Sequence, residues 1–283
     1  MEIHSDIVTS PPRDAASLIL LRDGTAGLEV FLLRRHGQSE VLGGAYVFPG
    51  GKLDASDLEL AAASHLDQSL AALHAALAEP RLSLAQASGL YVAALREAYE
   101  ECGVLLAEAA PTVLPQGLGF NAALAQLQLR LQTRALAPWS RWVTPRMPSV
   151  SSKRFDTRFF VAAMPADQRA QHDAVETTAS TWLRPRAALE RYWARELEFA
   201  PPQLMTLAHL SRFADVASVL QAARRQTPPL VAPEPFDDGG ERVLCYPGDP
   251  RHSLATRAMP GPTRLRVRNR RFEPEAGFDG FFA

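Results

Sequence analysis

The chain has little of what marks several common classes of protein. Its two cysteines, Cys102 and Cys245, are too few for a disulfide framework or a cysteine-ligated zinc site. The histidines lack the close spacing of metal-binding motifs. No apolar run is long enough to cross a bilayer as a helix. These absences exclude a disulfide-rich scaffold, a zinc module and a helical membrane protein.

The chain also lacks an excess of charge of either sign. It carries 30 basic and 31 acidic side chains, so its net charge is −1. A nucleic-acid binder normally shows a basic field, so we expect neither a nucleic-acid nor a membrane partner. Residues 1–6 show no basic stretch leading into an apolar one, and residues 281–283 are not a peroxisomal address. We therefore expect a cytoplasmic location.

A dense acidic run is present at residues 96–104, with the sequence Arg-Glu-Ala-Tyr-Glu-Glu-Cys-Gly-Val. At about 100° per residue, a helix places Glu97, Glu100 and Glu101 within one arc of its surface. The apolar side chains fall on the opposite side: Val92, Leu95, Tyr99 and Cys102. The pattern predicts an amphipathic helix from about Leu90 to Cys102 that ends at Gly103.

Three acids on one helix edge have two interpretations. Like charges at this spacing repel each other, and a bound divalent cation would turn that repulsion into attraction, because hard cations prefer carboxylate oxygens. Alternatively, the edge is a solvated acidic face in which Arg96 offsets Glu100 at i+4. The acids alone do not decide between the two.

The segment before this helix favours the first interpretation. Phe48-Pro49 precedes two glycines, Gly50 and Gly51, which allow a tight turn and a close approach of the backbone to a ligand. Together the two pieces resemble the signature of the Nudix hydrolase family. Gly51 matches its opening glycine, and the second half is matched in order by Arg96, Glu97, Ala98, Glu100, Glu101, Gly103 and Val104.

Two departures from the signature stand out. Asp57 stands where the signature has glutamate, and the stretch from Asp57 to Arg96 is far longer than the seven residues of the signature. The insertion, from Leu58 to about Gly89, is rich in Ala, Leu and His, so we expect one or two short helices. The signature segment, called the Nudix box, is thus unusually long. A long box is similar to that of the branch that includes the peroxisomal-type coenzyme A diphosphatases. Residues 142–145 and 154–160 also resemble that branch.

The fold class that the pattern and the resemblance indicate is α/β. We expect an α/β/α sandwich of the Nudix type, with a mixed sheet, helices in the box insertion, and extra helices and a hairpin at the C-terminal side. The expected domain spans residues 10–225, and residues 226–283, rich in Pro and Arg, are expected to pack on it as an extension.

Apolar runs and turn signals place the individual elements. Strands are expected as a hairpin over residues 15–35, then at 45–48, 155–162 and 175–183, with a second hairpin pairing 242–246 with 263–268. Helices are expected at 120–136, 187–197 and 203–224.

The resemblance also implies roles for the acids. Glu97, Glu100 and Glu101, with the carbonyl of Gly50, would bind Mg²⁺ or Mn²⁺. Arg96 would orient a carboxylate of this group. Glu176 is our candidate for the further acid that the family often supplies from a distant loop, although it could be an ordinary loop acid. Either Glu97 or Glu176 could act as the base, with Glu97 preferred.

Substrate phosphates are expected to meet arginines. Arg34 or Arg35 could pair with a phosphate, or both could be solvated at a strand end. Arg154 and Arg158 share a face of a predicted strand with Asp156, which could be part of a nucleotide pocket or an exposed sheet edge. The four tryptophans are expected in the core.

Three functions remain open from the sequence. The leading one is metal-dependent hydrolysis of the diphosphate of coenzyme A or acyl-coenzyme A. A second is pyrophosphatase activity on ADP-ribose, NADH or a dinucleotide. A third is a non-catalytic Nudix-fold protein that binds a ligand. The presence of all three acids and Arg96 argues against it, because a binding protein would not need them. A small nucleotide derivative is the expected partner, and a second copy of the chain is another candidate.

Overall fold

The centre of the fold is a mixed eight-stranded sheet. The computed structural model describes residues 7–39, 42–62, 65–111, 119–147 and 153–283, so residues 1–6, where we looked for a leader, lie outside it. Six strands follow the order β3-β2-β1-β6-β5-β8, while β4 pairs with β1 and β7 with β2. Their bounds are β1 Arg13–Gly24, β2 Gly27–Arg35, β3 Tyr46–Val47, β4 Gly50–Lys52, β5 Ala137–Val143, β6 Phe155–Ala163, β7 Thr177–Leu183 and β8 Leu230–Val231.

Strand β1 organises this sheet because it is apolar on both faces. Leu18 and Leu20 point into one hydrophobic cluster, and Ile19 and Leu21 point into the other, as strand alternation requires. One end of β1 forms the predicted hairpin with β2, and the other end pairs with β4. Strand β6 runs parallel to β1 along most of its length. The predicted hairpin and mixed sheet are therefore confirmed.

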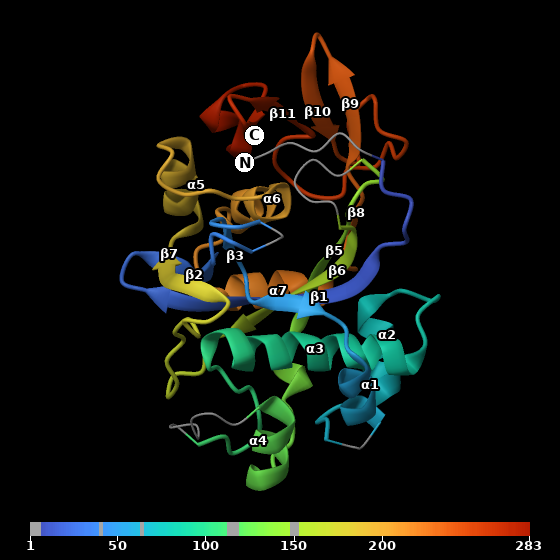
Figure 1. Ribbon diagram of the computed structural model, residues 1–283, viewed down its shortest axis with the longest axis vertical. Helices are drawn as coiled ribbons and strands as arrows, with labels where there is room; N and C mark the ends of the chain where they lie inside the picture. Colours follow the sequence, from blue (N-terminus) through green and yellow to red (C-terminus); the bar gives the residue numbers. More distant parts are fainter. Residues whose placement is uncertain (1–6, 40–41, 63–64, 112–118, 148–152) are drawn as a thin grey trace.

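Helices cover both faces of the sheet, which makes the predicted α/β/α sandwich (Figure 1). The long helix α3 lies against one face with three shorter helices around it. The second cluster, on the opposite face, holds α5, α6 and α7. The bounds are α1 Ala55–Ala62, α2 Leu70–Leu77, α3 Leu84–Cys102, α4 Phe120–Leu127, α5 Pro185–Trp193, α6 Pro201–Leu210 and α7 Val216–Arg225, with short 3₁₀ turns at Thr133–Ala135 and Phe278–Phe282.

The motif helix α3 is longer than the sequence predicted. It begins at Leu84 because Ser83 and Gln86 form a capping box: each side chain accepts a hydrogen bond from the other residue's backbone N–H. It ends at Gly103, whose φ of 68° suits glycine. The insertion therefore contains the end of α1 and all of α2, and its last residues belong to the motif helix itself.

Three other predicted helices had wrong boundaries. The helix predicted at 120–136 stops at Leu127, because Gln128 takes a left-handed conformation, and β5 follows as a strand that the sequence pattern did not indicate. The helix predicted at 203–224 is two helices, since Asp215 caps a new start at α7. Helix α5 covers Pro185–Trp193 rather than 187–197.

The C-terminal residues form a second, antiparallel sheet with the order β12-β11-β10-β9. Its strands are β9 Glu234–Asp238, β10 Glu241–Cys245, β11 Arg264–Arg268 and β12 Arg271–Pro274. The predicted terminal hairpin is present as β10 and β11, with Val243 opposite Arg266. Leu244, Leu265 and Phe272 are buried in the same cluster as α5 and α6. None of the helices within the described ranges is long and apolar enough to span a bilayer.

Candidate active site

A cavity of about 640 Å³ lies beside the acidic edge of α3. Its walls come from segments far apart in the chain: the turn into β4, the edge of α3, neighbouring parts of β1, β5 and β6, the start of α6, and the C-terminal sheet. Residues that represent these walls are Ser17, Gly50, Glu97, Trp142, Phe159, Gln203 and Leu244. The fold thus brings segments from Arg13 to Leu244 to one site.

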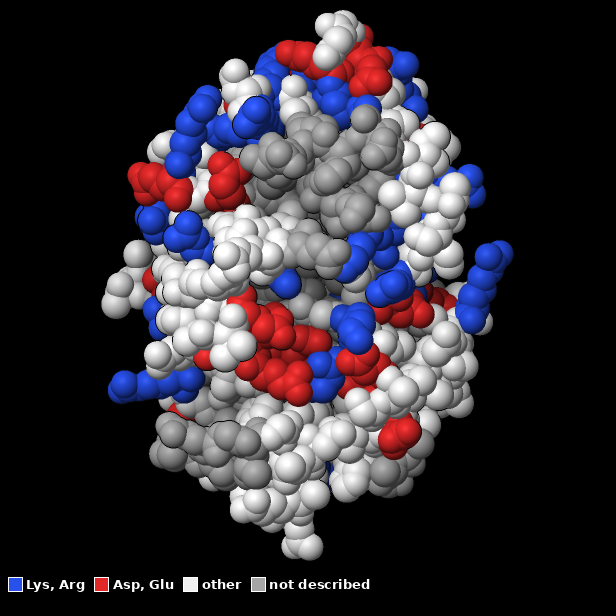
Figure 2. Space-filling view, viewed as in Figure 1, with Lys and Arg blue, Asp and Glu red and all other residues white. Residues whose placement is uncertain are grey.

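The three box acids line this cavity but differ in exposure. Glu100 is exposed, Glu97 is partly buried, and Glu101 is only 4% exposed. Glu101 Oε2 accepts a hydrogen bond of 2.9 Å from the backbone N–H of Gly50, which joins α3 to the start of β4. Figure 2 shows acidic side chains gathered over the middle of α3, next to a hollow in the surface, with basic side chains beside them.

Arg96 holds the acids in place from the side. Its Nη1 donates to Glu97 at 2.7 Å and to Glu100 at 2.9 Å. Its Nε and Nη2 donate to the two oxygens of Asp57 at 2.8 and 3.1 Å, and Nη2 also reaches the carbonyl of Lys52. The guanidinium is therefore occupied within the protein, as a positioning group would be.

Asp57, the residue that departs from the Nudix signature, is completely buried. One of its oxygens also accepts a hydrogen bond from the backbone N–H of Asp54 at 2.9 Å. Its contacts with Arg96 thus link α1 to the acidic edge of α3. In this position the shorter side chain still reaches its arginine.

Burial and crowding shift the titration of two of the acids. Burial, with the nearby charges of Glu97 and Glu176 adding to it, raises the pKa of Glu101 to about 8. The hydrogen bond from the Gly50 N–H and the charge of Arg35 oppose this rise. Burial also raises the pKa of Glu97, which Arg96 opposes. Negative charge is therefore costly at this end of the cavity unless a cation joins it.

The two glycines at the turn allow the backbone to approach these groups closely. A Cβ on Gly51 would collide with the carboxylate of Glu97, and one on Gly50 would meet the Ala16 carbonyl oxygen at 2.7 Å and Ser17 at 2.8 Å. A side chain at Gly50 would meet the backbone, and one at Gly51 would displace the Glu97 carboxylate, so the two glycines let the acids face the main chain directly.

The donor set suits a hard divalent cation such as Mg²⁺ or Mn²⁺, because three carboxylates and a backbone carbonyl supply only oxygen. Over the ranges that the structure covers, however, no three Asp, Glu, His or Cys side chains already converge as a ligand set. The oxygens of Glu97 and Glu100 are instead turned to Arg96, and that of Glu101 to Gly50. The residues fit the ion in chemistry.

Two residues named from distant segments reach the cavity. Glu176, just before β7, lines it, and its charge acts on both Glu97 and Glu101. Arg35, at the end of β2, lines it too, and its Nε is buried without a hydrogen-bond partner in the described structure. Its neighbour Arg34 is exposed and does not line the cavity.

The structure does not bring Arg154 and Arg158 to the cavity. Arg154 donates to the carbonyls of Ser10, Thr144 and Pro145. Arg158 is 3% exposed and is bound by the carboxylates of Glu79 and Asp14. The expected pocket face of β6 is thus a site of internal pairing, because the box insertion supplies Glu79 opposite it.

Sequence reasoning missed several wall residues. Trp142 is buried, as expected of a tryptophan, yet it also lines the cavity. Gln203 and Leu244 line it as well. Nothing in the local sequence marks the latter two, because only the packing of α6 and the C-terminal sheet places them there.

Comparisons with known proteins agree with this architecture. The family model described as the NUDT19 Nudix domain matches residues 10–210. The chain is 26% identical over 290 residues to the acyl-coenzyme A diphosphatase NUDT19 of Xenopus laevis, covering 81% of this chain and 74% of that protein. It is 28% identical over 239 residues to the Homo sapiens protein of the same name, covering 68% and 63% respectively.

A crystal structure of a NUDIX hydrolase from Alicyclobacillus acidocaldarius is similar to the fold, with a TM-score of 0.61 and 26% identity, covering 78% of this chain and 99% of that one. A mixed sheet between helices, with a glycine turn facing an acidic helix edge, defines a hydrolase of the Nudix type. The chain belongs to the Nudix family, in its NUDT19 branch.

Proposed function

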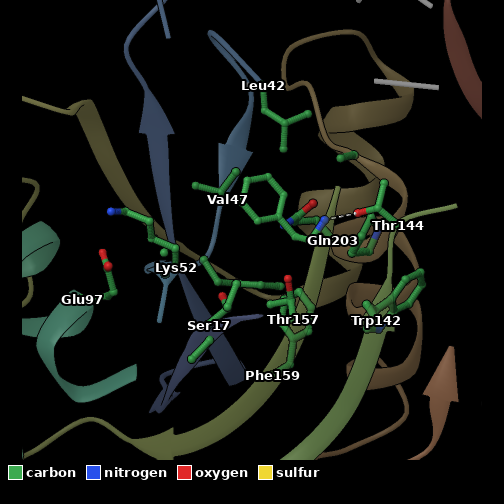
Figure 3. Close-up of a pocket in the computed structure, with 18 of the residues that line it drawn as sticks. Ser17, Leu42, Val47, Lys52, Glu97, Trp142, Thr144, Thr157, Phe159 and Gln203 are labelled. Carbon is green, nitrogen blue, oxygen red and sulfur yellow. Dashed lines mark hydrogen bonds between the residues drawn. The ribbon is translucent and has the colours of Figure 1, made fainter. Parts of the chain in front are cut away.

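We propose that this enzyme hydrolyses the diphosphate bridge of coenzyme A or acyl-coenzyme A. The products are adenosine 3′,5′-bisphosphate and phosphopantetheine or its acyl derivative. One observation carries the proposal: a single cavity joins an acidic end on α3 to an uncharged, aromatic end at Trp142 and Phe159 (Figure 3). The names of the relatives in the NUDT19 branch support the same substrate class.

The acidic end supplies the groups for phosphate chemistry. Glu97, Glu100 and Glu101, with the carbonyl of Gly50, would hold the divalent cations, which neutralise phosphate oxygens and stabilise the leaving group. Arg96 fixes the direction of Glu97 and Glu100. Asp57 fixes Arg96 in turn, so the acids do not have to be ordered at the moment of reaction.

Hydrolysis needs a base for the water. Water adds to one phosphorus, the bond from that phosphorus to the bridging oxygen breaks, and the proton of the water passes to a carboxylate. Glu97 is our preferred base, because it lines the cavity at its acidic end and Arg96 fixes its direction. Glu176, on the other side of the same cavity, is the alternative.

Arg35 is the proposed contact for a substrate phosphate. It lines the cavity, and its buried Nε has no partner in the described residues, so it can donate to an incoming oxygen. A guanidinium binds phosphate through two parallel N–H groups, which gives direction as well as charge.

The test is to incubate the purified protein with Mg²⁺ or Mn²⁺ and with coenzyme A, an acyl-coenzyme A, NADH or ADP-ribose, and to identify the products by mass. A chelator control measures turnover without metal. Adenosine 3′,5′-bisphosphate together with phosphopantetheine is the expected result. AMP from NADH or ADP-ribose, with coenzyme A left intact, would keep a diphosphatase and discard the proposed substrate. No product with either metal would favour a binding protein.

A further inference from the structure

Gln203 is a buried polar residue in the wall of the cavity. It is the third residue of α6, directly after Pro201 and Pro202, and it is 7% exposed. Its Oε1 is buried and has no hydrogen-bond partner in the described structure. Gln203 nevertheless lines the cavity, so a ligand there would lie against its side chain.

An amide oxygen in this state is unusual. Buried polar atoms in folded proteins are nearly always hydrogen-bonded, because water is lost on burial and a partner must replace it. The two prolines begin the helix and fix the backbone before Gln203. The free protein therefore bears the cost of an unpaired group that is held rigidly at a cavity wall, which suits a group that pairs with a ligand.

The neighbours of Gln203 indicate what kind of ligand segment lies there. Figure 3 shows Gln203 close to Thr144 and Trp142, with Phe159 below them and with Glu97 and Lys52 on the opposite side. Thr144, Trp142 and Phe159 are uncharged, and two of the three are aromatic, while the cationic Arg13 and Lys153 line other parts of the cavity wall. A segment bound at this end would carry no charge, would have apolar carbons, and would offer at least one N–H to Gln203.

The two arms of the proposed substrate differ in these properties. The adenosine arm of coenzyme A carries a phosphate on its ribose, whose charge needs cations or several N–H donors. The pantetheine arm is uncharged and has two secondary amides between apolar carbons. Resting on the proposed function, we infer that Gln203 binds an amide of the pantetheine arm and so determines the specificity for this substrate class.

The test replaces Gln203 by methionine, which keeps the length of the side chain and removes both polar atoms. Thr206→Val is the matched control: Thr206 lies one turn later on α6, is also buried with an unpaired Oγ1, and does not line the cavity. Calorimetric titration with Mg²⁺ present would measure the binding of 4′-phosphopantetheine and of adenosine 3′,5′-bisphosphate to each protein.

Gln203→Met is expected to weaken the binding of 4′-phosphopantetheine by about tenfold, because one buried hydrogen bond is lost. The affinity for adenosine 3′,5′-bisphosphate should stay within about twofold of the wild-type value. Thr206→Val should change neither affinity. The melting temperature of Gln203→Met should stay the same or rise, since the variant loses an unpaired group. A marked fall would show that Gln203 supports the fold instead.

Two other results would overturn the inference. Weakened binding of adenosine 3′,5′-bisphosphate alone would show that Gln203 pairs with the adenine base. Unchanged binding of both products would show that Gln203 touches neither arm. Failure of the proposed function looks different: the wild-type protein would then leave coenzyme A intact in the turnover assay, whatever residue stands at position 203.

Discussion

Two arginines in this protein each gather several carboxylates, with opposite outcomes. The Arg96 cluster comprises Arg96, Asp57, Glu97 and Glu100 and borders the cavity. The Arg158 cluster comprises Arg158, Arg141, Glu79, Asp14 and Asp156. Both draw acids from segments distant in sequence. The first is open to solvent at Glu100, while the second is largely enclosed.

Each carboxylate of the Arg158 cluster is held by at least one of its two arginines. Arg158 donates to both oxygens of Glu79 at 2.9 and 2.7 Å, and Arg141 donates to both oxygens of Asp156 at 2.8 and 2.6 Å. Glu79 also meets Arg141 at 2.8 Å. Because Glu79 follows α2, these pairs attach the box insertion to β5 and β6.

The Arg96 cluster has more acid than its single arginine can neutralise. Glu101, next to it, has only a backbone N–H, and its pKa is raised. The same residue types thus make an anchor where two arginines hold three acids, and a candidate ion-binding site where three acids share one arginine and the neighbouring Glu101 has no arginine partner. Four experiments test these assignments.

The largest effect is expected from removing one acid of the excess. Glu100→Gln and Glu101→Gln should each lower kcat/KM by about 100-fold or more, because each variant loses a carboxylate proposed to hold the metal. Thermal melting should show both folded, since neither change creates an unpaired buried charge. Glu59→Gln, an exposed acid on α1, is the control. Turnover like that of the wild type in either variant would refute the metal assignment.

The next effect concerns the Arg158 cluster. Arg158→Met should reduce the free energy of unfolding by about 3–5 kcal/mol, because Asp14 loses its arginine and Glu79 keeps only Arg141. Urea denaturation measures this, with exposed Arg224→Met as a control. The KM for coenzyme A should not change. A large rise in KM in the folded variant would restore the expectation that Arg158 binds substrate.

A third test concerns His209, a partly buried histidine near the charge of Arg212. Burial lowers the pKa of His209 from its ordinary value of 6.5 to about 4. The unfolded chain therefore binds a proton between pH 6.5 and 4 that the folded protein excludes, so stability is complete above pH 6.5 and falls as the pH drops toward 4. The loss at pH 5 should be about 1–2 kcal/mol.

The check is to compare the free energy of unfolding at pH 7 and pH 5 in the wild type and in His209→Phe. This variant keeps a ring against Trp139, which stacks on His209 with centroids 4.6 Å apart. Its stability should fall less over the same interval. An equal fall in both proteins would assign the pH dependence to other groups.

The smallest effect separates two neighbouring arginines. Arg35→Gln should raise the KM for coenzyme A about tenfold, because one charge-assisted phosphate contact is lost, with a smaller change in kcat. Arg34→Gln is the matched control, since Arg34 is exposed and outside the cavity. Equal KM values for the two variants would remove Arg35 from the phosphate site.

The sequence predicted what local patterns determine. The alternation of β1, the hairpin with β2 and the amphipathic face of α3 all follow from the spacing of apolar residues, and the glycines before β4 mark a close approach. Helix ends were less predictable. The helix after Phe120 stops where Gln128 adopts a left-handed conformation, and no apolar period announces that.

The sequence did not predict how deeply individual side chains are buried or which distant side chains they contact. Alternation along β6 shows that Arg154 and Arg158 share a face, but it does not show that Glu79 would lie against that face. For the same reason the sequence did not reveal Gln203. Gln203 stands out because its Oε1 has no hydrogen-bond partner in the described structure and because it lines the cavity. Both facts depend on how distant segments pack together.

The position of Leu244 in the cavity wall has a consequence for how the enzyme is made. During synthesis the acidic helix leaves the ribosome well before β10, yet β10 supplies part of the wall. A nascent chain can therefore carry every box acid and still lack a finished binding surface. On refolding, we expect secondary structure to return before turnover, so enzymatic activity would report the last docking step rather than the first collapse.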